Sequence, residues 1–272
     1  MTWWCSAQGV AWSWTWRAYP GVWLMGLAIG LAVSWPAVRA PHRWPPRERI
    51  LFFTGLALWW LAADWPIGAL GAGYLLSMHQ LQYLVFVMIA PPLLLLGTPE
   101  WLLTCWMAGR AAPVFRLLTR PLVALLLCNT IVILTHLPSV VDGVMEQQLG
   151  SFAVDFSWLA AGLLLWWPVL ARVPALGTLS YPARFGYLLA VTVLPGVPAA
   201  FFFFANYPVY ALYELAPPVG TWSATDDQFL AGIIMKFGGL LVVVTALTIL
   251  FFRWYDRDRA RPGTFVLPPA WE

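Results

Sequence analysis

Charge is scarce in this sequence, because Asp, Glu, Lys and Arg make up only 10% of its 272 residues. An ordinary soluble domain carries roughly 25% of these residues, so the composition argues against a soluble globular protein. Cysteine is also scarce, and Cys5, Cys105 and Cys128 lie too far apart for a disulfide framework or a CxxC metal site. The first residues lack the basic start and unbroken apolar core of a cleaved signal peptide, so we expect the first apolar stretch to direct insertion.

Hydrophobic residues make up 61% of the chain, and its 19 tryptophans include the pairs Trp59–Trp60 and Trp166–Trp167. Tryptophan favours the boundary between lipid and water, and about 20 apolar residues in a helix cross the hydrocarbon core. We therefore predict an all-α integral membrane protein, a single domain over 1–272, with seven transmembrane helices. Pro91 and Pro92 are expected to interrupt the third helix. The seven stretches are residues 20–38, 49–66, 71–97, 121–137, 151–170, 185–205 and 227–252.

Basic residues occupy alternate loops of this arrangement. All 15 lysines and arginines except Arg17 and Lys236 follow the first, third or fifth stretch or lie in the tail at 253–272. Cytoplasmic loops are enriched in Lys and Arg, so we expect the N-terminal segment 1–18 outside and the basic tail inside. The arginines thereby have a topological explanation, and nucleic acid is not an expected partner. Segment 98–120 mixes apolar and basic residues, which predicts an amphipathic helix in the membrane surface.

Two histidines are candidate metal ligands. His79 lies eight residues into the stretch 71–97, and His136 lies near the outer end of the fourth stretch, so both belong to the outer half of the membrane. Met78 adjoins the first histidine, and Asp155 lies about one turn into the fifth stretch. Imidazole and thioether groups suit copper, and polar groups inside a membrane usually have a function, so a copper site of these four residues is one interpretation. The alternatives are a histidine that bonds a neighbouring helix and a methionine that only packs.

The outer end offers further polar and sulfur-containing groups. Asp142 and Met145 precede the fifth stretch, and Asp226 and Asp227 begin the seventh. One of the two adjacent carboxylates most simply caps the N-terminus of its own helix. Cys5 lies in an outer segment that we expect to be mobile, where lipidation, oxidation and a role as an entry ligand are all open.

Lys236 is predicted near the membrane midplane, about 15 Å below the start of the last stretch. An ammonium group at this depth needs a counter-ion or a wet cavity. Asp155 is the one carboxylate expected inside a span, so we predict an ion pair between the two side chains, direct or through water. The alternative is that Lys236 lines a polar pathway.

Five motifs follow one another along the chain. The third stretch contains MHQLQYLVFVMIAPPLLLLGTP, and THLPSVVD ends the fourth. The motif AYPGVWL precedes the first stretch, WWPVL closes the fifth, and DQFLAGIIM, followed shortly by two glycines, lies in the seventh. In these motifs and their order, the sequence resembles the CtaG-type cytochrome c oxidase assembly proteins, which are seven-helix bacterial membrane proteins. The resemblance covers nearly the whole chain.

This resemblance implies a role in maturing haem–copper oxidase, described as copper insertion into the buried centre of the catalytic subunit. By position, His79 corresponds to the first histidine of the third-helix motif and His136 to the histidine of the HLP motif. Three positions depart from the family pattern: Tyr83 stands where members often have a second histidine, residues 151–156 read SFAVDF where histidines are common, and Lys236 replaces an aromatic residue.

The resemblance further implies a location in the bacterial inner membrane and four expectations about partners and cofactor. These are lipid, the oxidase catalytic subunit, a periplasmic copper donor and copper itself. Two other functions stay open: a metal-free scaffold or accessory subunit of a respiratory complex, and a haem protein with His79 and His136 as axial ligands. The sequence shows no nucleophile paired with a base, no phosphate-binding loop and no paired catalytic carboxylates, so we do not expect an enzyme.

Overall fold

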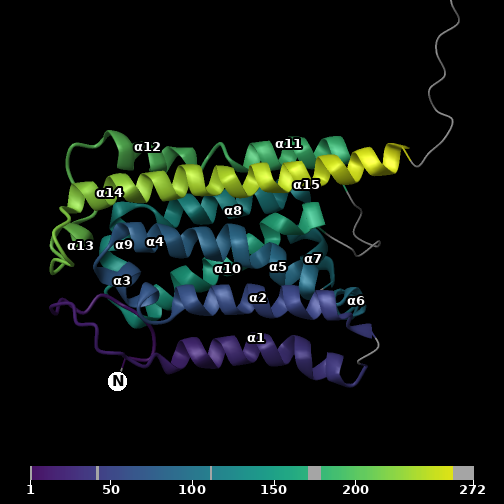
Figure 1. The fold of residues 1–272 in the computed structure, drawn as a ribbon, viewed down its shortest axis with the longest axis horizontal. Coiled ribbons are helices and arrows are strands. Elements are labelled where there is room, and N and C mark those ends of the chain that lie inside the picture. The colour runs from purple at the N-terminus through teal and green to yellow at the C-terminus, as the bar shows by residue number, and fades with distance from the viewer. Residues whose placement is uncertain (1, 41–42, 111, 171–178, 260–272) are drawn as a thin grey trace, which may run out of the picture.

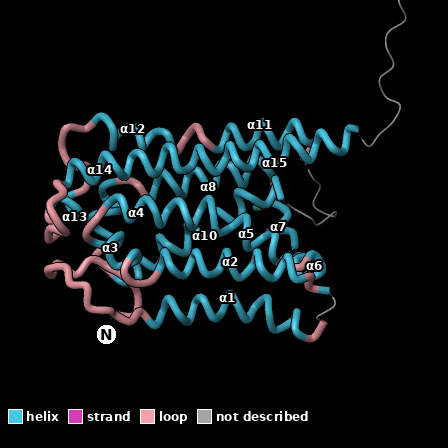
Figure 2. Tube along the Cα trace, viewed as in Figure 1, coloured by secondary structure: helices cyan, strands magenta, loops and turns pink. Residues whose placement is uncertain are grey.

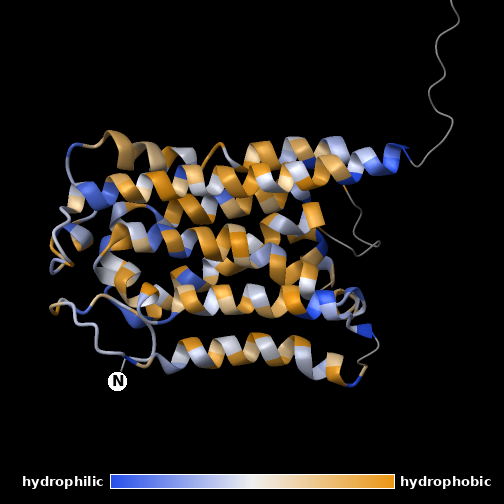
Figure 3. Cartoon of the chain, in the orientation of Figure 1, coloured by the Kyte–Doolittle hydropathy of each residue, from blue (hydrophilic) through white to orange (hydrophobic). Residues whose placement is uncertain are grey.

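The computed structural model describes residues 2–40, 43–110, 112–170 and 179–259, and within these ranges the chain is helical and contains no strand. The long helices run along one common axis (Figure 1), and most loops lie at the two ends (Figure 2). Strongly hydrophilic residues gather toward the helix ends, and apolar residues dominate between them (Figure 3). Helices satisfy their own backbone hydrogen bonds, which is why they can cross a bilayer.

Five helical segments are long and apolar enough to cross a membrane, or seven if each of two bent pairs forms one span. The five are α1 (Pro20–Val38), α4–η2–α5 (Leu76–Tyr83, Leu84–Ile89, Ala90–Gly97), α10 (Gln148–Leu170), α11 with α12 (Tyr181–Val191, Gly196–Phe204) and α14–η4–α15 (Ala224–Ile233, Ile234–Gly238, Gly239–Arg259). The pairs are α2 (Pro46–Ala63) with α3 (Ile67–Gly73), bent by 47°, and α7 (Ala112–Leu118) with α8 (Pro121–Thr135), bent by 75°. Three short helices complete the described chain: α6 (Glu100–Met107), α9 (Pro138–Val144) and α13 (Ala211–Glu214).

These helices confirm an all-α protein of several apolar spans. The number seven and the direction of each span through the membrane stay predictions. The tail was predicted to begin at residue 253, but α15 continues to Arg259, and the rest of that tail lies outside the described residues.

The predicted stretch 71–97 begins too early. Its first residues belong to α3, which ends at Gly73, and α4 begins at Leu76 after the extended residue Leu75. A Cβ at Gly73 would lie 2.6 Å from the Cα of Ala7, so glycine allows the N-terminal segment to pass against this turn. The apolar composition continues through the break, which is why composition alone does not reveal it.

Asp227 closes the N-terminus of α4. Its carboxylate accepts hydrogen bonds from the N–H groups of Leu76, at 2.6 Å, and Ser77, at 3.3 Å. Such N–H groups have no partner within their own helix, and the helix dipole favours a negative charge beside them. The predicted N-cap by one of the two aspartates does not form: Asp227 caps α4 instead, and Asp226 lies in the first turn of α14, where it accepts from the hydroxyl of Ser223 at 2.6 Å. Ser223 is the N-cap of α14 and accepts from the N–H of Asp226 at 3.1 Å.

The predicted interruption at Pro91 and Pro92 does not occur. Residues 84–89 form a π-helical turn, after which the N–H of Ala90 donates to the carbonyl of Val85. Prolines supply no N–H, and the wider π-turn accommodates the resulting change in hydrogen-bond pattern. The helix therefore continues to Gly97.

The two ends of the bundle differ in charge. The start of α2, the helices α6 and α7, and the end of α15 lie at one end, and the N-terminal segment, α3, α9 and α13 lie at the other (Figure 1). The first group carries six arginines and the second carries Arg17, so the basic segments predicted to share one side of the membrane share one end of the fold. Segment 98–120, predicted as one interfacial helix, instead forms α6 and α7 at the basic end.

Gly162 allows α10 to approach η2 and α5 closely. A Cβ at this position would lie 2.6 Å from the Cγ of Pro91 and 2.7 Å from the carbonyl oxygen of Val87. Gly186, in α11, offers a contrast, because no heavy atom lies within 4 Å of the position of its Cβ. The two glycines thus differ in packing, although both lie inside helices.

We expect Gly162→Ala to destabilise the protein by about 1–3 kcal/mol, because the backbone of η2 must move to admit a methyl group. Gly186→Ala is the matched control and should be neutral or stabilising by up to about 1 kcal/mol through helix propensity. Thermal unfolding of both purified variants in one detergent measures the difference. Equal melting temperatures for the two variants would contradict this account of the packing.

Candidate functional site

His79 and His136 meet at the end of the bundle opposite the arginines. Their ring centroids lie 6.3 Å apart, and the side chains are 1% and 5% exposed. His79 lies in the first turn of α4, so it is closer to the helix end than the predicted depth of eight residues. His136 is the residue that directly follows α8. Two segments that are distant in sequence thus place two imidazoles in one buried site.

Hydrogen bonding fixes the proton arrangement of His136. Its Nδ1 lies 2.7 Å from the carbonyl oxygen of Val132, and since a carbonyl only accepts, Nδ1 must carry the hydrogen. In the neutral ring, Nε2 then presents a lone pair. A ring N–H held by a backbone carbonyl is also the usual arrangement of a histidine that binds a metal through its other nitrogen.

The lone pair of His136 faces the side chain of Gln80. Nε2 lies 3.2 Å from the amide oxygen of Gln80, and the amide nitrogen of Gln80 is buried without a hydrogen-bond partner. Two acceptors do not bond each other, so two arrangements are possible. Either the amide is rotated so that its NH₂ group donates to Nε2, or a cation lies between nitrogen and oxygen.

Both ring nitrogens of His79 are buried without a hydrogen-bond partner. The ring packs against Trp158, with centroids 4.8 Å apart, and Tyr213, at 5.9 Å. These neighbours donate elsewhere: Trp158 to the hydroxyl of Thr135 at 2.8 Å and Tyr213 to the carbonyl of Gly71 at 2.6 Å. A buried polar group without a partner is costly, so the surroundings leave His79 available to a ligand.

The spacing of the two rings can be compared with that of two imidazoles that share one metal ion. A metal–imidazole bond is about 2.0 Å and the nitrogen lies roughly 1.1 Å from the ring centre, so one ion between two imidazoles separates their centroids by about 6 Å. The observed 6.3 Å is close to this limit. Two ligands of one ion stand roughly 3.3 Å apart at a tetrahedral angle, which compares with 3.2 Å between His136 Nε2 and the oxygen of Gln80. The two rings thus lie at the outer limit for sharing one ion, and Gln80 lies at ligand spacing from His136.

The other two predicted ligands have different surroundings. The carboxylate of Asp155 accepts a hydrogen bond from the indole N–H of Trp4 at 2.8 Å. Met78 is half-buried and directly precedes His79, so a helix points the two side chains about 100° apart. Within the described ranges no three His, Cys, Asp or Glu side chains group closely enough to hold a metal. The structure thus brings the two histidines together without a carboxylate beside them.

The predicted direct ion pair between Lys236 and Asp155 does not form in the described part of the chain. Asp155 instead faces Trp4, whereas Lys236 lines a pocket with Tyr83, Cys128 and other residues. The physical reason is that the N-terminal segment, whose burial no sequence pattern indicates, supplies a neutral N–H donor to the carboxylate.

Sequence reasoning missed Gln80, Trp158 and the packing role of Tyr83. The ring of Tyr83 meets that of His136 edge-on, with centroids 5.2 Å apart and planes at 84°. The ring centroid of Trp158 lies 5.7 Å from that of His136 and 4.8 Å from that of His79, so this ring contacts both histidines. One signal was visible in the sequence: Gln80 directly follows His79, and an amide inside an apolar stretch requires a partner.

Cys5 is not in a mobile segment. It is 1% exposed, and its thiol donates to the carbonyl of Ala63 at 3.4 Å. The segment is fastened by further bonds, from the N–H of Gly21 to the carbonyl of Trp3 at 2.8 Å and from the N–H of Ala7 to that of Met145 at 3.2 Å. Burial, with the negative charges of Asp155 and Asp64, raises the pKa of the Cys5 thiol well above its ordinary value.

We expect Cys5 to react with a maleimide at least about ten times more slowly than Cys105, which is exposed, because the thiolate is the reactive form and needs access. Two single-cysteine variants in detergent, followed by mass spectrometry over time at pH 7.5, measure the ratio. After denaturation the two should react at similar rates. Rapid labelling of Cys5 in the folded protein would show that the N-terminal segment opens.

Comparison with known proteins identifies related sequences. The family model described as cytochrome c oxidase caa3 assembly factor (Caa3_CtaG) matches residues 29–257, a range that includes both histidines and Lys236. Curated proteins of Mycobacterium bovis and Mycobacterium tuberculosis, both named as uncharacterized, are each 25% identical over 266 residues, which cover 86% of this chain and 38% of theirs. An uncharacterized protein of Mycobacterium leprae is 21% identical over 281 residues, covering 90% of this chain and 40% of its own.

The chain therefore spans about two fifths of the length of the curated relatives it matches. No solved structure matches it. The family model, in contrast, covers most of the chain, and on that match the chain belongs to the family of cytochrome c oxidase caa3 assembly factors.

Proposed function

We propose that this chain is a membrane assembly factor for a haem–copper cytochrome c oxidase and that it assists copper insertion into the catalytic subunit. The observation that carries the proposal is the buried pair of His79 and His136, in which both nitrogens of His79 are without a partner. The family supports a role in oxidase assembly, which requires contact with the oxidase but no catalytic turnover.

The chemistry of the pair suits a metal ion that is bound transiently and then transferred. Two imidazoles form a site of low coordination number, and an amide oxygen from Gln80 is a weak third ligand for copper. Few strong ligands permit exchange with a donor or an acceptor, whereas a complete set of thiolates would retain the ion. Met78 and Asp155, which the sequence placed in the same set, are outside this minimal site.

We further propose seven spans, with the arginine-rich end in the cytoplasm of a bacterial inner membrane. The N-terminal segment is then outside and the end of α15 inside. The histidine pair lies at the end opposite the arginines, and thus beneath the periplasmic surface. Copper could reach it from a periplasmic donor without crossing the bilayer, and the apolar helix faces contact lipid.

A metal-free scaffold or accessory subunit is the second candidate. It is favoured by Gln80, because a rotated amide would satisfy His136 Nε2 by itself. It is also favoured by the lack of a third strong ligand among the described residues. A haem ligated by both histidines is less suitable, since Trp158 packs against both rings and fills space that a macrocycle would need.

We expect the purified protein to bind close to one copper ion per chain after loading with Cu(I) and removal of free metal. His79→Ala and His136→Ala should each lose at least about 90% of this copper, because each removes one of two imidazoles. Metal analysis by mass spectrometry measures the ratio, and X-ray absorption reports the number of histidine ligands.

Two matched variants separate the minimal site from the set predicted from sequence. Met78→Leu and Asp155→Asn should retain copper, because among the described residues neither side chain forms a hydrogen bond with either histidine. Melting temperatures of all four variants check that the fold persists. If the wild-type protein binds no copper, the metal-free scaffold is the remaining function. If Asp155→Asn loses its copper, Asp155 belongs to the copper site after all.

A further inference from the structure

Lys236 carries an isolated charge deep within the last helix. It is the only lysine of the chain and the only charged residue between Asp227 and Arg253. At about 1.5 Å per residue it lies about 14 Å from the first of these and about 26 Å from the second, which places it inside a hydrocarbon core about 30 Å thick. Charged side chains at such depth normally have a partner, and they mark functional positions.

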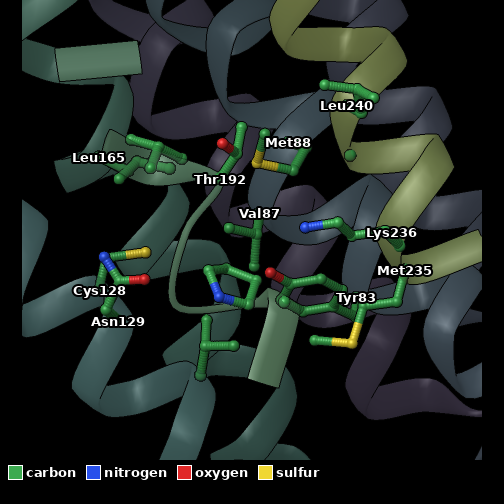
Figure 4. A pocket seen from close by; sticks show the side chains of 15 residues that line it. Tyr83, Val87, Met88, Cys128, Asn129, Leu165, Thr192, Met235, Lys236 and Leu240 are labelled. Carbon is green, nitrogen blue, oxygen red and sulfur yellow. The ribbon is translucent and has the colours of Figure 1, made fainter. Parts of the chain in front are cut away.

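The amine of Lys236 points into a pocket of the bundle rather than toward a helix end. In Figure 4 this amine and the hydroxyl of Tyr83 enter the same space, beside Val87. Across the pocket lie Cys128 and Asn129 of α8. Among the described residues neither the amine nor the Tyr83 hydroxyl has a hydrogen-bond partner, and no carboxylate lines the pocket.

Three irregular helical segments contribute to the walls of this pocket, beside α8 and α10. The two π-helical turns, η2 and η4, contribute Val87 and Lys236. The third wall is the break between α11 and α12, where Pro195 lacks the N–H that would otherwise bond the carbonyl of Val191. A Cβ at Gly196 would lie 3.0 Å from the Nζ of Lys236, so the ammonium rests against this break. π-turns inside helices frequently occur at functional sites.

The size of the pocket restricts what it can hold. Its volume is about 70 Å³. One water needs about 10–15 Å³ on this measure, and pockets for drug-sized ligands begin at about 300 Å³. The space therefore admits a few waters or one carboxylate, and it excludes a quinone ring or a haem. Lipid phosphates are unsuitable because they lie at the membrane surface, far from this depth.

The pocket opens to a face that lipid or another helix must cover. Lys236 is exposed, and the neighbouring segments expose apolar side chains: Phe237 of η4, Leu240 of α15, Leu189 of α11 and Phe201 of α12. A cation surrounded by apolar helix surface complements a helix that carries one acidic residue. We infer that this pocket binds the Asp or Glu side chain of a membrane-spanning helix of a partner protein. The partner is the oxidase catalytic subunit if the proposed function is correct; the charge pairing itself does not depend on that identity.

A zero-length cross-link tests the contact directly. Dicyclohexylcarbodiimide enters membranes and activates a carboxylate, and an amine in contact with it displaces the urea and forms an amide. Treatment of native membranes containing the tagged full-length chain should join Lys236 to an Asp or Glu within an apolar span of a partner, identified by mass spectrometry of the linked peptides. Lys236→Arg retains the charge but cannot form this amide, so the adduct should disappear while the partner still co-purifies.

A neutral variant tests the energetic role. Lys236→Met should reduce co-purification of the cross-linked partner at least about ten-fold relative to Lys236→Arg. Arg253→Met, which removes an exposed charge from the same helix, should leave it unchanged. A link to the oxidase subunit supports both proposals, and a link to a span of another protein supports the pocket but contradicts the oxidase as its partner.

Three results would overturn the inference. In the first, Lys236 is recovered without a cross-link although the oxidase co-purifies; this result contradicts the pocket contact but not the proposed function. The others are Lys236 joined only to a carboxylate of its own chain and Lys236 joined only to a lipid carboxylate.

Discussion

The carboxylate of Asp227 at the N-terminus of α4 is the interaction on which the site depends. The chain breaks at residues 74–75, so α4 starts with unpaired N–H groups inside the protein, and Asp227 reaches across from α14 to accept two of them. This contact fixes where α4 starts and therefore which way His79 and Gln80 face. Without it, the first turn of α4 would need another acceptor, and the histidine three residues on would lose its defined position.

The rest of the site follows from the limited hydrogen-bonding capacity of imidazole. Because Val132 fixes the proton of His136 on Nδ1, its Nε2 can only accept or coordinate. His79 has no partner at all, and the aromatic rings around it donate to other groups. The protein thus surrounds two imidazoles with apolar surface and one adaptable amide, which is an arrangement that a small cation can complete.

The sequence predicted what depends on composition and on local pattern. The length of the apolar stretches predicted the spans, and the occurrence of arginines in alternate loops predicted that these loops share one end. The depth of two histidines, inferred from the spans, placed both in the outer half, and the structure brings their rings together. These features need no knowledge of which helices touch.

The features that the sequence did not predict rest on contacts between distant segments. Asp227 caps Leu76, and Trp4 binds Asp155, each across 151 positions of the chain. Nothing near Asp155 signals that its partner is an indole from the N-terminal segment rather than Lys236. In both cases a carboxylate was assigned the nearest plausible role, and tertiary packing supplied a different donor.

Tyr83 connects the two candidate sites through one side chain. Its ring packs edge-on against His136, and its hydroxyl enters the pocket of Lys236. It stands on the last turn of α4, directly before the π-turn η2 that forms a pocket wall. A carboxylate bound by Lys236 would lie beside this hydroxyl and attract its hydrogen, and any movement of the ring would act on the neighbouring imidazole. If a partner docks at Lys236 as proposed, any effect of docking on the histidine pair would therefore pass through the position of this one aromatic ring.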